Sequence, residues 1–396
     1  MGVESQICLL MKSEDYRTKV QEMCYSATEM IEKLYKKTIN KGRLDFINNA
    51  CHALIVARSV QYCEIADKMT GDATEASKHR QVQRFMGEYD LDYEWVLCFL
   101  LFLLPKQGKV TLSMDRTEWE FGSQNHNVLV LSIYVHGVGF PIWFECLDNE
   151  GGNSDADDRA YILLSCIKFL GKSRIKCVIG DSEFIGIEWV KFLLKEEITF
   201  YIDVRTNQYF GYAGEEHQIS QYMANRKKKA LDNVHIFGSW LSISMKRQPP
   251  SKRGKRKSIL AIVTNGFAAH ALSNYRNRWS IEVLFESLKT RGFNLEDTHV
   301  DDPIRLRKLF ALCAIAYAFC FLMGLMADKI KKIVIKSNGY KTNSFFRYGL
   351  DFIRKALKNN EKRSDSTQIL ENINAIFKNI YKILHDNFFQ LKKIVM

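Results

Sequence analysis

Four residues in the stretch NYRNRWSIEVLFESLK have the types and the spacing of a group that binds phosphate or metal. Tyr275, Arg278, Glu282 and Lys289 follow one another at offsets of three, four and seven residues. At roughly 100° per residue, these offsets place the four side chains on one stripe of an α-helix. A carboxylate beside a guanidinium, an ammonium and a phenol is one acid among phosphate-binding groups. The alternative is a solvated amphipathic face with incidental charge pairs.

The same segment predicts a single helix with an apolar back. Ile281, Leu284 and Leu288 fall opposite the polar stripe, and Glu286 joins the stripe. We therefore expect one helix from Tyr275 to Lys289 whose apolar side is buried in the protein.

Two aspartates at the ends of β-branched runs supply further carboxylates. Asp115 closes VTLSMD and Asp181 closes IKCVIGD, so each is predicted to end a strand. Sites form at the strand ends of open α/β sheets. Two such aspartates and Glu282 could bind two divalent cations about 3.5–4 Å apart, the arrangement used for in-line attack on phosphodiesters. A lone aspartate at a strand end is usually a turn residue or a helix cap, but the coincidence of three carboxylates weakens that alternative.

With these residues in place, the chain resembles a DDE transposase of a bacterial insertion sequence, and in particular the insertion-sequence-four family. That family's Y-x2-R-x3-E-x6-K signature is matched without a gap from Tyr275 to Lys289. The DRTEW context begins at Asp115, and the DSEF context begins at Asp181. The segment KTRGFNLEDTH also resembles the family. The resemblance covers roughly residues 107 to 326, and its Tyr-to-Lys signature is the specific part.

The resemblance implies cut-and-paste DNA transposition through a hairpin intermediate. Asp115, Asp181 and Glu282 are then the catalytic residues and the ligands of two Mg²⁺ ions, for which Mn²⁺ would substitute. Family members flip a base onto an aromatic side chain, and Trp240 is the predicted platform, with Trp119 and Trp279 as weaker candidates. The alternative for Trp240 is core packing of a strand residue.

The side chains around these carboxylates have predicted roles of their own. Arg278 is expected to grip phosphate oxygens with two donors, and Lys289 to act as a point charge. Tyr275 would donate a hydrogen bond to phosphate or pack against a sugar. Glu183 and Glu286 are expected to be supporting or solvated groups rather than metal ligands.

The charge of the chain predicts a polyanionic partner. The net charge is +12, and the basic residues are in excess over 205–260 and 261–396, whereas 111–204 are acidic. A DNA backbone would match the basic segments. The family resemblance implies that the partner is double-stranded DNA, both the inverted repeats of the element and its target, and that the chain acts as a dimer in the synaptic complex. The ten cysteines show no zinc-like spacing and are expected to be buried thiols of a cytoplasmic, nucleoid-associated bacterial protein.

One uncharged run leaves a membrane alternative open. Residues 309–327, LFALCAIAYAFCFLMGLMA, are long enough to cross a bilayer. The preferred interpretation is a buried helix of a large fold, with no membrane partner, because the run directly follows the predicted site helix.

The predicted fold is α/β, with an RNase H-like catalytic domain interrupted by a β-rich insertion and flanked by helical regions. The expected divisions are a helical DNA-binding region (1–106), the first part of the core (107–204), a basic β-rich insertion (205–262), the second part of the core with the Glu282 helix (263–328) and a helical C-terminal region (329–396). Strands are expected near 109–114, 127–136, 139–146, 175–180 and 199–204, with crossover helices at 155–170 and 188–197. In this topology the first and fourth strands are parallel neighbours, which brings Asp115 and Asp181 together.

Two segments outside the core are candidates for contact with DNA. Residues 60–86 predict two short helices about a Gly71-Asp72 turn, with Thr74 capping the second helix. The pair is either a helix-turn-helix that places its second helix in the major groove or an ordinary helical hairpin with a polar outer face. The second helix offers the following polar side chains: Lys78, His79, Arg80, Gln81, Gln83 and Arg84. A basic loop in the insertion is either a phosphate contact or a solvated loop. Its cations are Lys252, Arg253, Lys255, Arg256 and Lys257.

Two rival functions share most of these features. A catalytically inactive DNA-binding remnant is disfavoured because all three carboxylates are present. A structure-selective nuclease on the same fold would cleave DNA without joining it to a target.

Overall fold

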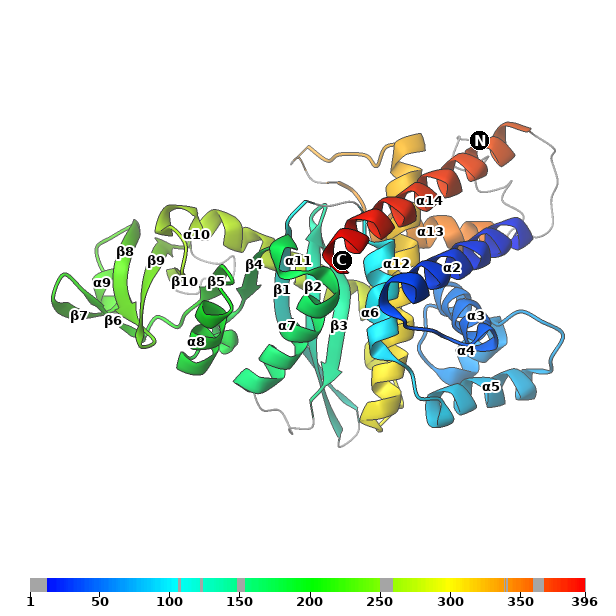
Figure 1. Ribbon diagram of the computed structural model, residues 1–396, viewed down its shortest axis with the longest axis horizontal. Coiled ribbons are helices and arrows are strands. Elements are labelled where there is room, and N and C mark those ends of the chain that lie inside the picture. Colours follow the sequence, from blue (N-terminus) through cyan, green and yellow to red (C-terminus); the bar gives the residue numbers. More distant parts are fainter. Residues whose placement is uncertain are drawn as a thin grey trace. The chain divides into compact units, whose positions relative to one another are not determined.

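The chain divides into two compact units in the computed structural model, which describes residues 13–105, 108–121, 124–147, 154–249, 259–337, 339, 341–358 and 367–395. The helical unit lies within residues 1–107, 118–126 and 284–396. The sheet unit comprises 108–117 and 127–283. The mixture of one large sheet with many helices confirms the predicted α/β class (Figure 1).

The helical unit contains the predicted helical N-terminal region and the helices that follow the sheet. Its helices are α2 Ser13–Tyr35, α3 Lys41–Ala57, α4 Tyr62–Lys68, α5 Glu75–Glu88, α6 Tyr93–Leu103, α12 Pro303–Ile330, α13 Phe345–Lys358 and α14 Thr367–Val395. Helix α14 packs against α2 and α6, and α12 packs against α3, α6 and α13. The three N-terminal helices α2, α3 and α6 therefore share one core with helices from the C-terminal part of the chain.

Helix α12 contains the uncharged run and is buried within the helical unit. It is the one helix of the described residues that is long and apolar enough to cross a membrane, and its most apolar stretch is 94% buried. A Cβ at Gly324 would lie 1.8 Å from the carbonyl oxygen of Phe345, and one at Gly349 would lie 1.8 Å from that of Cys320. Helices α12 and α13 thus touch backbone to backbone through these glycines. This packing is that of a core helix, as predicted.

Helices α4 and α5 have the predicted helix–turn–helix sequence order. Gly71 in the connection has φ = +110°, a conformation that glycine adopts without a steric cost. The Thr74 hydroxyl accepts a hydrogen bond from Ser77 N at 3.2 Å and so caps α5. One side of α5 is fully buried, through the side chains of Val82, Phe85 and Met86. The opposite side of α5 is left to solvent.

The sheet unit is built on parallel strands that bring distant segments together. The strands are β1 Val110–Phe121, β2 Gln124–Val135, β3 Val138–Cys146, β4 Ile175–Gly180, β5 Phe200–Asp203, β6 Tyr209–Tyr212, β7 Glu215–Gln218, β8 Lys228–Ile236, β9 Ser239–Arg247 and β10 Ile259–Thr264. Their order is β3-β2-β1-β4-β5-β10-β9-β8-β6-β7. Strand β4 pairs in parallel with both β1 and β5, which confirms the predicted neighbourhood of the first and fourth strands.

The prediction that a strand ends at Asp115 is wrong. Strand β1 continues to Phe121, although its register with β4 stops at the pair Met114–Gly180. Beyond that point β1 still has β2 as its neighbour. Its side chains alternate there, since Thr117 and Trp119 are buried whereas Glu118 and Glu120 are exposed. Pairing on one edge alone is enough to keep the backbone extended, so the ladder to β4 ends but the strand does not.

The predicted β-rich insertion is β-rich, but its strands extend the central sheet. Strand β10 lies between β5 and β9 and runs antiparallel to both. The predicted boundary at residue 262 therefore falls inside a strand, and the division into domains stays a prediction. The cations of the predicted basic loop, residues 252–257, lie outside the described residues.

The helices of the sheet unit include the segment that carries the Tyr-to-Lys signature. They are α7 Ala156–Leu170, α8 Ile187–Lys195, α9 Ile219–Tyr222, α10 Ala268–Tyr275 and the start of α11 Trp279–Leu288. The prediction of one helix from Tyr275 to Lys289 is wrong. Tyr275 ends α10, residues Arg276–Arg278 form a 3-10 turn, and Lys289 lies just beyond α11. Because a 3-10 turn has about three residues per turn rather than 3.6, the stripe is broken after Tyr275.

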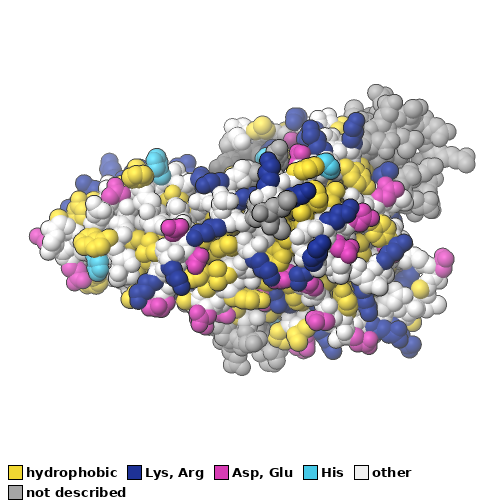
Figure 2. All heavy atoms as spheres, in the orientation of Figure 1, with side chains coloured by type: hydrophobic (Ala, Val, Ile, Leu, Met, Phe, Trp, Pro, Cys, Tyr) yellow, Lys and Arg dark blue, Asp and Glu magenta, His cyan; other side chains and the backbone are white. Residues whose placement is uncertain are grey.

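On the visible face of the molecule (Figure 2), cations are spread out rather than gathered in one place. On the face shown in Figure 2, Lys and Arg side chains are interspersed with Asp and Glu over the whole outline. The net charge of +12 therefore does not by itself locate a surface for a polyanion. Such a surface has to be found from local groups of side chains.

Gly139 sets the distance between strand β3 and helix α11. A Cβ at this position would lie 3.0 Å from the carbonyl oxygen of Ser280 and 3.3 Å from Cα of Ile281. Ile281 is fully buried, as predicted for the back of the site helix. Helix α11 can therefore lie close against β3 only because residue 139 has no side chain.

We expect Gly139→Ala to lower the free energy of unfolding by about 1–3 kcal/mol, the usual cost of overpacking. Equilibrium unfolding in urea measures the change. The control is Gly108→Ala, because a Cβ at Gly108 would meet no atom within 4 Å. Equal stability of both variants would show that α11 can move away from β3 without cost.

Candidate functional site

Three aspartates occupy corresponding positions on three neighbouring parallel strands. The register pairs Met114 of β1 with Gly180 of β4, and Gly180 with Ile202 of β5. The next residue in each segment is an aspartate: Asp115, Asp181 and Asp203. The parallel pairing therefore places a row of carboxyl groups across the sheet, at the end where the β4 ladder stops.

The guanidinium of Arg278 joins this row to the carboxylate of Glu282. Arg278 Nη1 lies 3.5 Å from Asp115 Oδ2 and 3.4 Å from Asp181 Oδ2. Arg278 Nη2 donates a hydrogen bond to Glu282 Oε1, one turn further along. One cation thus contacts all three of the carboxylates that the sequence predicted for the site.

Burial makes a negative charge on Asp115 costly. Burial raises the pKa of Asp115 to about 7, although the nearby Arg278 and a hydrogen bond from the backbone N–H of Arg116 oppose the shift. Burial alone would lower the pKa of Arg278, but Tyr275 and the three carboxylates outweigh it and raise the pKa. The site therefore needs positive charge, and Arg278 supplies it.

Asp203 is a site residue that the sequence analysis missed. Burial, and then the charge of Asp181, raise the pKa of Asp203 to about 7, and its Oδ1 is buried without a hydrogen-bond partner. The available signal was the run FYID, a short apolar strand that ends in an aspartate as IKCVIGD does. Without the strand order, nothing showed that the strand of FYID pairs with the strand that Asp181 follows.

Tyr275 packs in the apolar cluster next to Arg278. Its ring is 8% exposed and packs with Cys177, Ile179, Tyr201 and other apolar residues. The Arg278 guanidinium lies 5.9 Å from the centre of this ring, at the outer limit of a cation–π contact. In the described structure Tyr275 is thus mostly a packing residue, and its predicted contact with phosphate stays a prediction.

Arg116 and Glu183 form a second ion pair at the edge of the site. Arg116 Nε donates to Glu183 Oε1 at 2.8 Å, and its Nη2 donates to Oε2 at 2.9 Å. This two-pronged contact ties the residue after Asp115 to the turn after Asp181. Glu183 is therefore a supporting group, as expected.

Lys289 and Glu286 belong to the helical unit and have partners there. Lys289 Nζ donates to the carbonyl oxygen of Glu118 at 2.9 Å and pairs with Glu296 at 2.8 Å. Glu286 pairs with Arg291 at 2.7 Å. Lys289 is thus neither on the helix that carries Glu282 nor a free cation, and its predicted action on phosphate stays a prediction.

The chemistry of the donor set fits a hard divalent cation. No group of three His, Cys, Asp or Glu within the described ranges is arranged to hold a metal ion directly. The carboxylates of Asp115, Asp181 and Glu282 are the oxygen ligands that Mg²⁺ prefers, and all three meet one positive group. A divalent cation could take the place of the guanidinium, provided that Arg278 moves aside.

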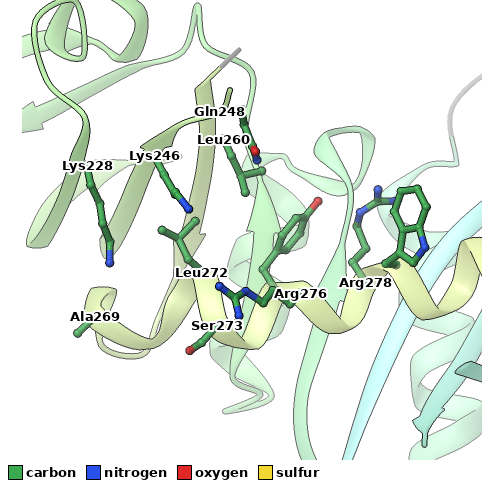
Figure 3. Close-up of a pocket in the computed structure, with 11 residues that line it drawn as sticks. Lys228, Lys246, Gln248, Leu260, Ala269, Leu272, Ser273, Arg276 and Arg278 are labelled. Atoms are coloured by element: carbon green, nitrogen blue, oxygen red, sulfur yellow. The ribbon is translucent and has the colours of Figure 1, made fainter. Parts of the chain in front are cut away.

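A basic hollow, lined in part by Arg278, opens in the sheet unit (Figure 3). It has a volume of about 480 Å³. Lys228, Lys246 and Arg276 line it and are exposed, and Arg278 and Trp279 lie at its end near the site. None of these three cations has an ion-pair partner among the described residues. The hollow therefore offers unneutralised positive charge next to a negative site.

The three candidate tryptophans lie in different environments. Trp279 is 63% exposed and lines the basic hollow. Trp240 is 71% exposed, which excludes the alternative of core packing, and it lines a separate hollow of about 450 Å³ with Tyr209 and His235. Trp119 is buried, and the ammonium of Lys289 lies over its ring. Among the three, Trp279 is the exposed ring beside the carboxylates.

Comparison with known proteins places this site in a family. Residues 106–319, more than half of the chain, match the family model described as the transposase DDE domain. A search of curated proteins finds no match. Among solved structures, the chain is similar to the piggyBac transposase in a cryo-EM synaptic complex with hairpin DNA, at 12% identity and a TM-score of 0.38, over 90% of this chain and 85% of that chain. This TM-score is too low to establish a shared fold.

The raised pKa values predict how stability depends on pH without divalent ions. An unfolded aspartate releases its proton near pH 4, whereas folded Asp115 and Asp203 hold theirs up to about pH 7. The folded state therefore binds more protons between these values, and the free energy of unfolding should fall as pH rises from about 4 to about 7. Asp203→Asn should make this fall shallower.

Thermal unfolding in EDTA at a series of pH values measures the effect. Parallel curves for Asp203→Asn and the wild type would show that Asp203 is ionised in the folded protein throughout this range. The comparison does not depend on enzymatic activity.

Proposed function

Because the chain belongs to the transposase DDE domain family, we propose that it cleaves DNA at the ends of a mobile element and joins those ends to a target. The observation that carries this proposal is the contact of one guanidinium, Arg278, with Asp115, Asp181 and Glu282. It places three carboxylates from two strands and a helix within reach of one cation. The proposed route is cut-and-paste transposition, as in the insertion-sequence-four family that the Tyr-to-Lys signature resembles.

Two Mg²⁺ ions, or Mn²⁺ in their place, would be held by Asp115, Asp181 and Glu282. Such ions make a water or a 3′-hydroxyl more acidic and stabilise the leaving oxygen. Asp203 forms no ion pair with Arg278 in the described part of the chain, but its carboxyl group lies next in the row. Above its raised pKa of about 7 it would add negative charge that draws cations to the site. No side chain of the row is required as a nucleophile.

The role proposed for Arg278 follows from its position. In the described structure its guanidinium neutralises the carboxylates that the metal ions would occupy. Once those carboxylates are taken by cations, the guanidinium is free to bind phosphate oxygens with two donors. Arg278 would therefore stabilise the site in the absence of metal and the reacting phosphate in its presence.

The basic hollow is the proposed path of the DNA strand. Lys228, Lys246 and Arg276 would contact backbone phosphates that lead to the carboxylates. Trp279 is the better placed of the two exposed tryptophans for stacking a base beside the reacting bond. Stacking on Trp240 and passage through a DNA hairpin stay predictions.

Other features support the wider proposal. The order β3-β2-β1-β4-β5 with parallel β1, β4 and β5 is what the predicted RNase H-like core requires. We further propose a dimer that holds two element ends of double-stranded DNA, acting in the cytoplasm of a bacterium. The preserved carboxylates argue against an inactive remnant.

The rival function is a structure-selective nuclease that uses the same carboxylates. The two functions share the cleavage step and differ in the next one. Incubation with element-end DNA, a plasmid target and Mg²⁺ separates them, because only a transposase yields covalently joined products. Cleavage without any joined product would favour the nuclease.

We expect Asp115→Asn, Asp181→Asn and Glu282→Gln each to abolish cleavage while DNA binding stays within several-fold of the wild type. The reason is that these groups are assigned to metal rather than to DNA. Cleavage of end DNA in Mg²⁺ and gel-shift binding in EDTA give the two readouts. The control is Glu188→Gln, an exposed carboxylate of α8 that should leave both unchanged. Near-normal turnover by any one of the three variants would remove that residue from the site.

We expect Arg278→Ala to slow the chemical step by on the order of 10²-fold or more, the effect of losing a preorganised donor. Arg278→Lys should restore only part of the rate, since a point charge cannot reproduce a two-pronged contact. Single-turnover cleavage by preassembled complexes measures the step. Arg276→Ala is the control, because Arg276 lines the hollow but is not paired with a carboxylate; it should weaken binding and leave this rate unchanged. A normal rate for bound Arg278→Ala would make Arg278 a purely structural residue.

A further inference from the structure

A second group of unneutralised cations lies in the helical unit, on the solvent side of helix α5. Arg80, Gln83, Arg84 and Gly87 are spaced by three, four and seven residues from the first, so they form one stripe. All four positions are exposed. The stripe lies opposite the buried side of α5 and is free to meet a partner.

Arg305, at the start of α12, completes this group from a distant part of the sequence. Together with the α5 stripe it lines an open hollow of about 350 Å³. A Cβ built on Gly87 would lie 3.9 Å from Arg305 Nη2. The Arg305 guanidinium therefore lies directly beside α5, at ordinary van der Waals distance from this position.

The three guanidiniums, those of Arg80, Arg84 and Arg305, form no ion pair in the part of the chain that the structure describes. Glu88 is the one acidic side chain that lines the hollow, and it pairs with none of them. Three like charges around one hollow repel one another, and Arg80 and Arg84 do so at the i,i+4 spacing that destabilises a helix. This repulsion destabilises the free protein. An anion bound between the three guanidiniums would remove it, which gives a reason for their arrangement.

Hydrogen bonds hold together the ends of α5 and α12 that carry Arg84 and Arg305. Lys308, one turn after Arg305, is 3% exposed and donates hydrogen bonds to the carbonyl oxygens of Phe85 at 3.3 Å and Tyr89 at 2.8 Å. This buried ammonium ties α12 to the C-terminal end of α5. The Asp302 side chain caps α12 by accepting from Arg305 N at 2.8 Å. These contacts hold in place the backbone from which Arg84 and Arg305 extend toward the hollow.

We propose that Arg80, Arg84 and Arg305 form a site for one backbone phosphate of double-stranded DNA. Guanidinium groups are suited to phosphate because they present several donors in a plane. A phosphate held there would orient α5 against the duplex without reading its sequence, since phosphate contacts position and base contacts specify. The inference rests on the proposed function as a DNA enzyme, but this site is separate in sequence and chemistry from the carboxylate row.

The test is binding of a random-sequence DNA duplex of about 30 base pairs, three helical turns, measured in EDTA over a series of salt concentrations. Replacing the three arginines by glutamine should weaken binding at least tenfold and lower the slope of log K against log salt by roughly 0.9, the value for one phosphate. Each single variant should show most of this loss, because the three share one ligand. Stability should stay equal or rise, since like charges are removed.

The matched control replaces three exposed lysines of the same unit, Lys33, Lys36 and Lys329, by glutamine, with the same change in charge. An equal loss of binding in this control would overturn the proposal, because net charge alone would then explain the effect. Additive losses from Arg84→Gln and Arg305→Gln in a double-mutant cycle would also overturn it, since a shared phosphate requires coupling. If the triple variant does not fold, the two singles and their cycle decide the question.

Binding in EDTA needs no catalysis, so the outcome is independent of the proposed reaction. A wild-type protein that binds DNA through these arginines but never joins strands would keep this inference and remove the proposed function. A protein that joins strands while Arg305→Gln leaves binding and its salt slope unchanged would do the reverse.

Discussion

The need of closely spaced carboxylates for a cation is the constraint on which the candidate site depends. Asp115, Asp181, Asp203 and Glu282 come from the ends or interiors of three strands and from a helix, and carboxylates brought so close repel one another. Asp115 and Asp203 also lose hydration by burial. In the described structure Arg278 balances three of them, and the raised pKa values of Asp115 and Asp203 show that the balance is incomplete. A site that lacks positive charge in this way favours the binding of any further cation that can enter it.

The scaffold answers this constraint by rigid positioning. Parallel pairing of β4 with β1 and β5 places the aspartates in one row, and parallel strands require long crossover segments between them. The close approach of α11 to β3 at Gly139 then fixes the backbone position from which the Glu282 side chain extends. Tyr275 and the apolar cluster below it support the arginine. Each of these contacts acts on the geometry of the charged groups rather than on their chemistry.

The arginines of this chain differ in role according to whether carboxylates lie next to them. Arg278 is surrounded by carboxylates, so it stabilises the folded protein until other cations replace it. Arg80, Arg84 and Arg305 have no such partners and converge on an open hollow, so they gain only when an anion arrives. Net charge would not distinguish the two, because both raise the total of +12 by the same amount.

The parallel pairing of the first and fourth strands is predicted from the RNase H-like topology that the order of strands and helices matches. The sequence by itself determined the carboxylates, the Tyr-to-Lys spacing and the buried back of the site helix. These follow from local patterns, since hydrophobic periodicity and residue type act over a few neighbours along the chain. Tertiary structure alone decided that Asp203 stands in the row, that Arg305 joins α5, and that β1 runs past Asp115. It also broke the predicted helix at Arg276–Arg278 and gave Lys289 partners of its own. Strand order, one-sided pairing and contacts between residues hundreds of positions apart depend on the whole fold, and no local pattern of residues records them.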